Sequence, residues 1–97
     1  MLRHVALFRW TPETTDAHVA AVKEALEALP GQVPTIRSYA VGPDIRLGDD
    51  RWDFAVIAAF DDARGYQAYV DHPAHQQVAT ELIRPHLADR AHIQIAD

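Results

Sequence analysis

Two segments of the chain carry apolar side chains at both alternating sets of positions. One is residues 2–10 (LRHVALFRW) and the other is residues 51–60 (RWDFAVIAAF). A strand that is covered on both faces has this composition, whereas a strand with one wet face alternates apolar and polar residues. We therefore predict two strands in the middle of a sheet.

A helix is predicted between these strands, within residues 11–31. Thr11 or Thr15 can cap its start, and Pro30-Gly31 ends it. Apolar side chains recur at the spacing of one helical face, namely at Val19, Val22, Leu26 and Leu29.

A second helical region follows the strand at 51–60 and is predicted to be split. Asp61 and Asp62 open a short helix with an apolar stripe, and Pro73 breaks it and begins another helix. This last helix should stop near Arg84-Pro85, because the residue before a proline disfavours helical geometry. The stripes of the two short helices are Ala63, Tyr66 and Val70 in the first and His75, Val78 and Leu82 in the second.

Two further strands complete the order. Residues 35–42 form a more polar strand, residues 43–50 a loop that turns the chain back, and residues 90–96 a last alternating strand. The order is β-α-β-β-α-β, which predicts an α+β, ferredoxin-like fold with a four-stranded antiparallel sheet and both helices on one face. We expect one domain, residues 1–97.

The sheet face opposite the helices is predicted to be apolar, so we expect another protein surface to pack on it. We assign to it His4, Ala6, Phe8 and Trp10 of the first strand and Phe54, Val56 and Ala58 of its neighbour. An apolar patch of this kind is unfavourable in water. A second copy packed sheet to sheet would bury it, so we predict a homodimer.

The composition excludes several classes of site and of partner. The chain has 97 residues, no cysteine and a formal net charge of −5. The absence of cysteine excludes disulfides, thiolate nucleophiles, zinc fingers and iron–sulfur clusters. No run of Lys or Arg could bind phosphates in series, which argues against a nucleic-acid partner. Apolar runs are too short to span a bilayer and the N-terminal segment lacks a secretion pattern, so we expect a cytoplasmic protein with no membrane partner.

The stretch His72-Pro73-Ala74-His75 is the main candidate for chemistry. Proline is favoured at the first helical position, which places His75 in the first turn. The helix dipole disfavours a positive charge there, and a neutral imidazole could act as a general base near neutral pH. The same spacing also fits a partly buried histidine with a structural role. Tyr66 and Tyr69, three residues apart, equally fit a core or an interface.

A metal site is the alternative for the two histidines. A transition metal needs a third and a fourth ligand, and His4, His92 and the aspartates offer no pattern that selects them. The chain also lacks a glycine-rich phosphate loop and a serine nucleophile elbow. We therefore expect no metal and no cofactor.

Several motifs together resemble the stress-responsive A/B barrel (Dabb) family of the dimeric α+β barrel superfamily. They are RHVALFRW at 3–10, the threonine-capped first helix, VGPD at 41–44 and YVDHPAH at 69–75. The resemblance covers essentially the whole chain. It implies ferredoxin-like protomers that dimerise through their sheets, each with a cavity between sheet and helices.

Around YVDHPAH the chain is similar to plant polyketide cyclases of this family, which close a linear polyketide thioester into an aromatic acid by aldol condensation. This similarity implies catalytic roles for Tyr69 and His75 and a place in the pocket for His4, which enters from the sheet. The break at Asp71-His72-Pro73 should let the two short helices turn Tyr69 and His75 toward one cavity, with His72 occupied at the helix start. Those cyclases have a further pocket histidine on the third strand, where this sequence has Phe54. The aromatic residues that we expect to bind substrate are Phe8, Trp10, Phe54 and Tyr66.

Three functions follow from this interpretation. The preferred one is a cofactor-independent acid/base enzyme that acts on a small, carbonyl-bearing, largely apolar molecule, with polyketide-type cyclisation as the leading case. His75 would remove a proton next to the carbonyl, Tyr69 would hydrogen-bond the oxygen on which charge develops, and His4 would orient one of them or the substrate. The alternatives are a non-catalytic stress-response or small-ligand-binding protein and a cofactor-free monooxygenase-like enzyme.

Overall fold

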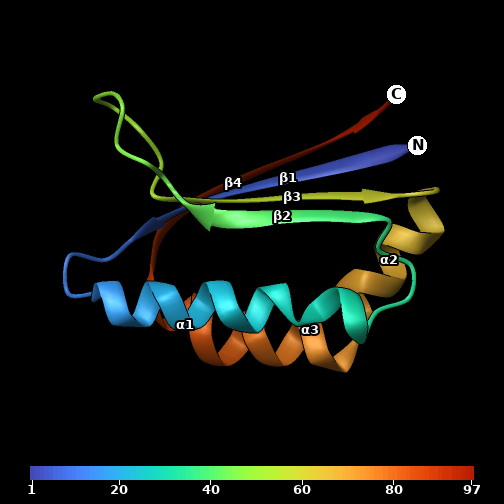
Figure 1. Cartoon of the computed structure of the whole chain (residues 1–97), viewed down its shortest axis with the longest axis horizontal. Helices are drawn as coiled ribbons and strands as arrows, with labels where there is room; N and C mark the ends of the chain where they lie inside the picture. Colours follow the sequence, from blue (N-terminus) through green and yellow to red (C-terminus); the bar gives the residue numbers. More distant parts are fainter.

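The computed structural model describes residues 1–97 and shows a four-stranded sheet with the helices gathered beneath one face (Figure 1). The order of strands is β2-β3-β1-β4, and each neighbouring pair is antiparallel. This arrangement confirms the predicted ferredoxin-like fold. The main elements are β1 (Leu2–Trp10), α1 (Asp16–Glu27), β2 (Ser38–Pro43), β3 (Phe54–Phe60), α2 (Ala63–Asp71), α3 (Pro73–Val78) and β4 (Leu87–Ala96).

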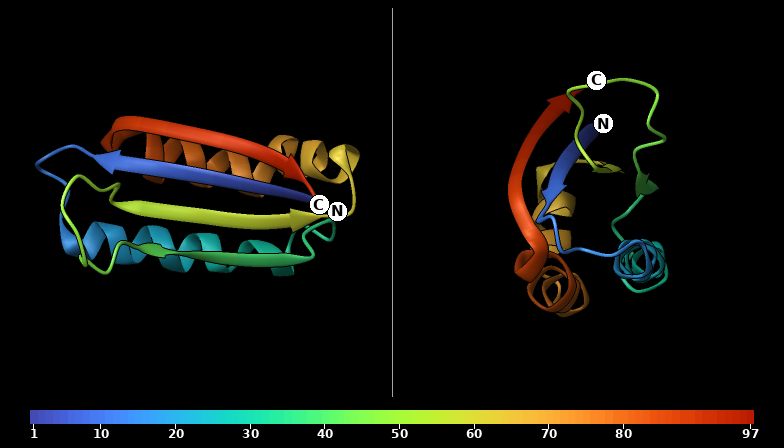
Figure 2. Two further views of the ribbon diagram at one scale, coloured as in Figure 1. Left: turned by 90° about the horizontal axis from the view of Figure 1, so that it is seen from above. Right: turned by 90° about the vertical axis from the view of Figure 1, so that its left-hand side faces the viewer.

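Three short helical turns link these elements. A 3₁₀ turn, η1 (Leu29–Gly31), follows α1, while the π turn η2 (Ala79–Ile83) and the 3₁₀ turn η3 (Arg84–His86) continue α3. Seen from above, the strands lie over the helices, and the end view shows the curved sheet above α1 and α3 (Figure 2). No helix is long and apolar enough to cross a membrane.

The helix boundaries follow from local capping groups. The Thr15 side chain accepts a hydrogen bond from the backbone N–H of His18 (3.1 Å), and Asp62 accepts one from Gly65 (2.9 Å). Such caps satisfy N–H groups that the first helical turn leaves unpaired. The predicted helix starts are confirmed at Thr15 and Asp62. The strand limits are less well predicted, since β3 begins at Phe54 and β4 at Leu87.

The two faces of the sheet are assigned the wrong way round by the sequence pattern. His4, Ala6 and Phe8 point toward the helices and are at most 9% exposed, as are Phe54, Val56 and Ala58 on β3. The side chains of this set fill the space between the sheet and the helices. Both sets are apolar, so alternation alone could not tell which one the helices cover.

The opposite face carries a patch of aliphatic side chains that we call the outer face. Val5 of β1 lies between Ile57 of β3 and Ile93 of β4, and Ile95 lies on the same face beside Arg3. Ile57, Ile93 and Ile95 are 45%, 60% and 50% exposed. The physical argument for a partner on the sheet therefore remains, although the residues differ from those predicted.

Candidate active site

A cavity of about 320 Å³ lies between the sheet and the helices of the C-terminal half. Its walls come from β1, β3 and β4 on one side and from α1, α2, α3 and the turns η2 and η3 on the other. Five of the predicted site residues line it, namely His4, Phe8, Tyr66, Tyr69 and His75. The fold thus brings residues from both halves of the chain to the wall of one small cavity.

Two of the predicted substrate-binding residues lie elsewhere. Phe54 is 1% exposed and packs between Phe8 and Trp10, with ring centroids 6.2 and 5.7 Å away. Trp10, at the far end of β1, borders a separate polar hollow beside Lys23 and Asp44. Neither Trp10 nor Phe54 lines this cavity, because β1 carries Trp10 away from it and Phe54 is enclosed by its aromatic neighbours.

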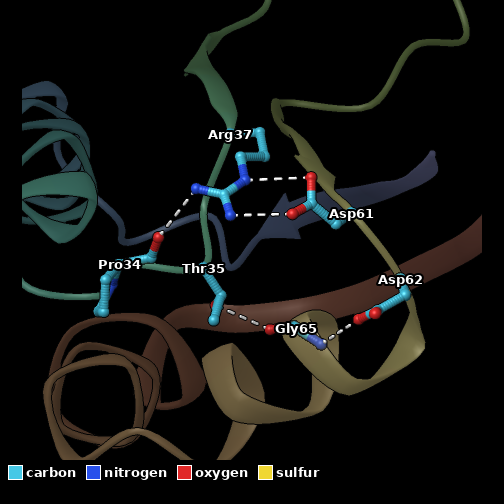
Figure 3. Close-up of polar contacts among 6 residues, drawn as sticks. All are labelled: Pro34, Thr35, Arg37, Asp61, Asp62 and Gly65. Carbon is cyan, nitrogen blue, oxygen red and sulfur yellow. Dashed lines mark hydrogen bonds and ion pairs between the residues drawn. The ribbon is translucent and has the colours of Figure 1, made fainter.

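Figure 3 shows the polar contacts at the start of α2, the helix that carries Tyr66 and Tyr69. The Thr35 hydroxyl donates to the carbonyl of Gly65 (2.8 Å), and the Arg37 guanidinium donates twice to the carboxylate of Asp61 (3.1 and 2.8 Å). A Cβ at position 65 would lie 3.4 Å from the Cβ of Thr35, so a glycine allows this close approach. The first turn of α2 is therefore held against the segment that precedes β2.

The break between α2 and α3 brings Tyr69 and His75 together. His72 is extended (φ −64°, ψ 133°), and its Nδ1 accepts a hydrogen bond from the backbone N–H of Ala74 (3.0 Å). The predicted role of His72 at the helix start is confirmed. Residues six apart on one helix would point about 120° away from each other. Here the rings of Tyr69 and His75 have centroids 4.3 Å apart.

Tyr69 keeps its proton at neutral pH. Its side chain is buried, and burial raises the pKa of the Tyr69 hydroxyl to about 12, with a smaller contribution from Tyr66 and an opposing one from the hydrogen bond to Tyr39. The oxygens of Tyr39 and Tyr69 are 2.7 Å apart. Burial also raises the pKa of Tyr39 well above its usual range. Tyr69 is therefore a hydrogen-bond donor rather than a base.

His75 is neutral at the same pH. Burial lowers the pKa of the His75 imidazole, the charges of Arg84 and His72 lower it further, and the carbonyl of Val70 opposes them. Its Nδ1 atom is buried and has no hydrogen-bond partner of normal geometry. A neutral ring can accept a proton, which a charged ring cannot.

His4 reaches the cavity from the sheet. Burial lowers the pKa of His4 to about 4, and the neighbouring His92 and His75 contribute. The side-chain amide nitrogen of Gln94 lies 2.8 Å from Nδ1 of His4. An amide nitrogen only donates, so the neutral ring carries its proton on Nε2. The His4 ring is 4.9 Å from that of Tyr66 and 6.4 Å from that of Tyr69, between centroids.

The arrangement does not resemble a metal site. No group of three or more histidine, aspartate or glutamate side chains is placed to hold an ion. The pair His72 and His75 cannot act as two adjacent ligands, because Nδ1 of His72 caps α3.

Several residues of the site were not identified from the sequence. Tyr39 contacts Tyr69 from β2, Gln94 holds His4 from β4, and Arg84 and Arg90 line the cavity. The one feature of the sequence that could have indicated such a residue was Tyr39, an aromatic side chain in the strand predicted to be more polar than the others. The others become neighbours only through strand pairing over long sequence distances.

One known protein family matches nearly the whole chain. The sequence profile of the Stress Responsive A/B Barrel Domain family matches residues 2–96. The chain belongs to this family. An uncharacterised protein of Streptomyces coelicolor is 36% identical to this A/B barrel protein over 78 residues, which are 78% of this chain and 80% of the relative.

Solved structures show the same fold. A dimeric ferredoxin-like protein of unknown function from Thermobifida fusca superimposes with a TM-score of 0.92 at 43% identity, covering 99% of this chain and 90% of that chain. A hydroxynitrile lyase from Passiflora edulis shares the fold at 14% identity (TM-score 0.84, 97% and 90% covered). An antibiotic biosynthesis monooxygenase does so at 20% identity (TM-score 0.80, 100% and 98% covered).

Proposed function

We propose that this A/B barrel protein is a cofactor-independent acid/base enzyme that acts on a small, carbonyl-bearing, largely apolar molecule. The observation that carries the proposal is the contact between a neutral His75 and a protonated Tyr69 at one cavity wall. The cavity volume, about 320 Å³, lies at the lower end of the range of roughly 300–1,000 Å³ for small-molecule sites.

The reaction begins with proton removal. The substrate carbonyl accepts a hydrogen bond from the Tyr69 hydroxyl, and the His75 imidazole takes a proton from the adjacent carbon. The electron pair of that C–H bond forms a C=C bond, and the π pair of the carbonyl moves onto its oxygen, which gives an enolate. A donor that is already in place stabilises the developing charge, because little reorganisation is needed during the step.

Cyclisation is our preferred outcome for this enolate. Its carbon attacks a second carbonyl carbon of the same molecule, forming a C–C bond and an alkoxide. The protonated His75 returns its proton to the alkoxide, and loss of water from the resulting alcohol gives the unsaturated ring. Each proton that His75 removes is therefore returned, which a reaction without an external acid or base requires.

The nitrogen of His75 that acts as base is Nε2. The Nδ1 atom is enclosed by protein, which leaves Nε2 as the ring nitrogen that can meet a ligand. In the tautomer with its proton on Nδ1, the lone pair lies on Nε2. On the sheet side, the Nε2–H of His4 would donate to a substrate oxygen.

Hydrogen–deuterium exchange next to a carbonyl tests the proposal without knowledge of the natural substrate. Proton NMR would follow exchange into 2-heptanone in D₂O, with and without protein. His75→Ala should lower the protein-dependent rate on the order of a hundredfold or more, as for loss of a general base. Tyr69→Phe should lower it by about a hundredfold, as for one oxyanion donor.

His86→Ala provides the matched control, because it removes an imidazole that does not line the cavity and contacts the Thr14 hydroxyl instead. Its exchange rate per folded molecule should stay within about twofold, while stability falls by about 1 kcal/mol for one lost hydrogen bond. No exchange above buffer by the wild type, or full activity in His75→Ala, would contradict the proposal.

The alternative functions use the same cavity and give different results. A small-ligand-binding protein would bind the ketone without exchanging its protons. A cofactor-free monooxygenase, a function suggested only by the fold shared with the antibiotic biosynthesis enzyme, would consume dissolved oxygen with substrate. An oxygen electrode distinguishes this reaction from proton exchange.

A further inference from the structure

The charge of the cavity lining is opposite to that of the protein. The chain has 14 Asp and Glu against 9 Lys and Arg, yet no aspartate or glutamate lines the cavity. Two arginines do, Arg84 of η3 and Arg90 of β4. The remaining lining residues are apolar, aromatic, glutamine or histidine, and one of them, His92, lies at an exposed position of β4.

Neither of these arginines is paired with a carboxylate. The ion pairs of the protein involve Arg3, Arg9, Arg37 and Arg51. The carboxylate of Asp89, the sequence neighbour of Arg90, pairs with Arg9 (3.7 Å) and accepts a hydrogen bond from the backbone N–H of Arg90 (2.8 Å), not from its guanidinium. Arg84 and Arg90 are exposed, so they lie at the rim of the cavity and not in its depth.

The two charges act on groups inside the cavity. Burial lowers the pKa of His75, and the guanidinium of Arg84 lowers it further. Burial raises the pKa of Tyr66, and the guanidinium of Arg90 opposes that rise. The rim carries these two cations and no carboxylate.

We propose that the ligand of this cavity is amphiphilic, with an oxyanion group held at the rim by Arg84 and Arg90 and an apolar body inside. A guanidinium presents parallel N–H donors that match carboxylate and phosphate oxygens. The apolar body lies among Ala6, Leu26, Val56 and Ile83, which line the interior. The oxyanion is either a carboxylate or a phosphate of the ligand.

This inference deepens the proposed function, because it names the class of molecule on which His75 and Tyr69 would act, but binding can be measured without turnover. Calorimetry or NMR titration would compare hexanoate, hexyl phosphate and neutral hexanamide, which carry apolar chains of similar length. At low salt we expect an oxyanion ligand to bind about tenfold or more tightly than the amide, with the preference reduced by salt. Whether hexanoate or hexyl phosphate binds better identifies the source of the oxyanion.

Arg84→Gln and Arg90→Gln should each reduce this preference, and the double variant should abolish it while hexanamide affinity stays unchanged. Arg64→Gln is the matched control, since Arg64 on α2 is likewise exposed and unpaired but does not line the cavity. Equal affinity for the three ligands, or a full preference in the double variant, would overturn the inference.

Repeating the titrations in His75→Ala separates the two proposals. Oxyanion binding should survive in that variant although proton exchange is lost. Exchange without any oxyanion preference would leave the enzyme proposal standing and remove this one. Oxyanion preference without exchange would support a binding protein for amphiphilic anions.

Discussion

The hydroxyl oxygens of Tyr39 and Tyr69 lie 2.7 Å apart and join β2 to α2 beneath the sheet. Their rings meet edge to face, with centroids 5.9 Å apart. If Tyr39 donates this hydrogen bond, the proton of Tyr69 is left for a ligand in the cavity. Tyr39 is thus a positioning residue for the proposed reaction, acting through Tyr69.

Tyr39→Phe should slow the proposed exchange reaction. The variant keeps the ring contact but removes the donor, so the Tyr69 hydroxyl becomes a weaker and less directed acid. We expect a three- to tenfold lower kcat with little change in KM, and a loss of stability of about 1 kcal/mol for one hydrogen bond. Steady-state kinetics and urea unfolding measure the two effects.

A double variant checks that Tyr39 acts through its partner. Combined with Tyr69→Phe, the loss of the Tyr39 hydroxyl should cost no further activity, because the group that it orients is already absent. Multiplicative losses would instead show that Tyr39 contributes independently.

The pH dependence of exchange should show one limb over most of the accessible range. The rate should fall as pH decreases through the lowered pKa of His75, below its usual 6.5, because the protonated ring cannot accept a proton. No fall is expected between about pH 7 and about pH 10, since the pKa of Tyr69 is raised to about 12. A decline in activity near neutral pH would contradict this assignment.

His4 should make the fold sensitive to acid. Its pKa is lowered from 6.5 to about 4 in the folded protein, so the unfolded chain binds a proton first as pH decreases. The stability that depends on neutral His4 is present above pH 6.5 and is lost as the pH falls through the pKa of about 4. The loss is on the order of 2–3 kcal/mol.

Urea unfolding at a series of pH values tests this effect in wild type and in His4→Gln. The variant should show a smaller decrease in the free energy of unfolding between pH 6.5 and 4, the two pKa values of His4. An identical slope in both proteins would place the acid sensitivity at another group.

The elements that sequence could predict are those fixed by local chemistry. Thr15, Asp62 and His72-Pro73 determine helix starts through groups within three residues of each other, and all three appear as expected. The break at His72-Pro73 also allowed the placement of Tyr69 and His75 at one cavity to be anticipated. These features depend on backbone hydrogen bonds that neighbouring residues supply.

Features that depend on tertiary packing were not predictable in the same way. The choice of sheet face failed because Phe8 and Leu7, on opposite faces of β1, are both apolar. Tyr39 and Gln94 reach the site only after β2 and β4 have found their places beside the central strands. The arginine rim arises from η3 and β4, whose sequence shows no charge cluster.

Because the structure reverses the predicted faces of the sheet, Phe8→Glu and Ile93→Glu should have different effects. Phe8→Glu would place a carboxylate in the core beneath the helices, because Phe8 is 9% exposed. An unpaired buried charge costs several kcal/mol, so this variant should fail to fold or unfold at much lower temperature. Circular dichroism during heating measures the effect. A folded Phe8→Glu with unchanged stability would contradict the buried position.

Ile93→Glu tests the homodimer that we propose for this chain, following the dimeric Thermobifida fusca structure that it resembles. Ile93 is 60% exposed on the outer face, where a second sheet would cover it. The charge should separate the subunits and leave the protomer core intact, so light scattering at micromolar concentration should give a dimer for the wild type and a monomer for the variant. Ala21→Glu is the control, since Ala21 is exposed on α1, on the other side of the sheet, and should not affect association. A monomeric wild type would contradict the homodimer, and a dimeric Ile93→Glu would place the interface somewhere other than the outer face.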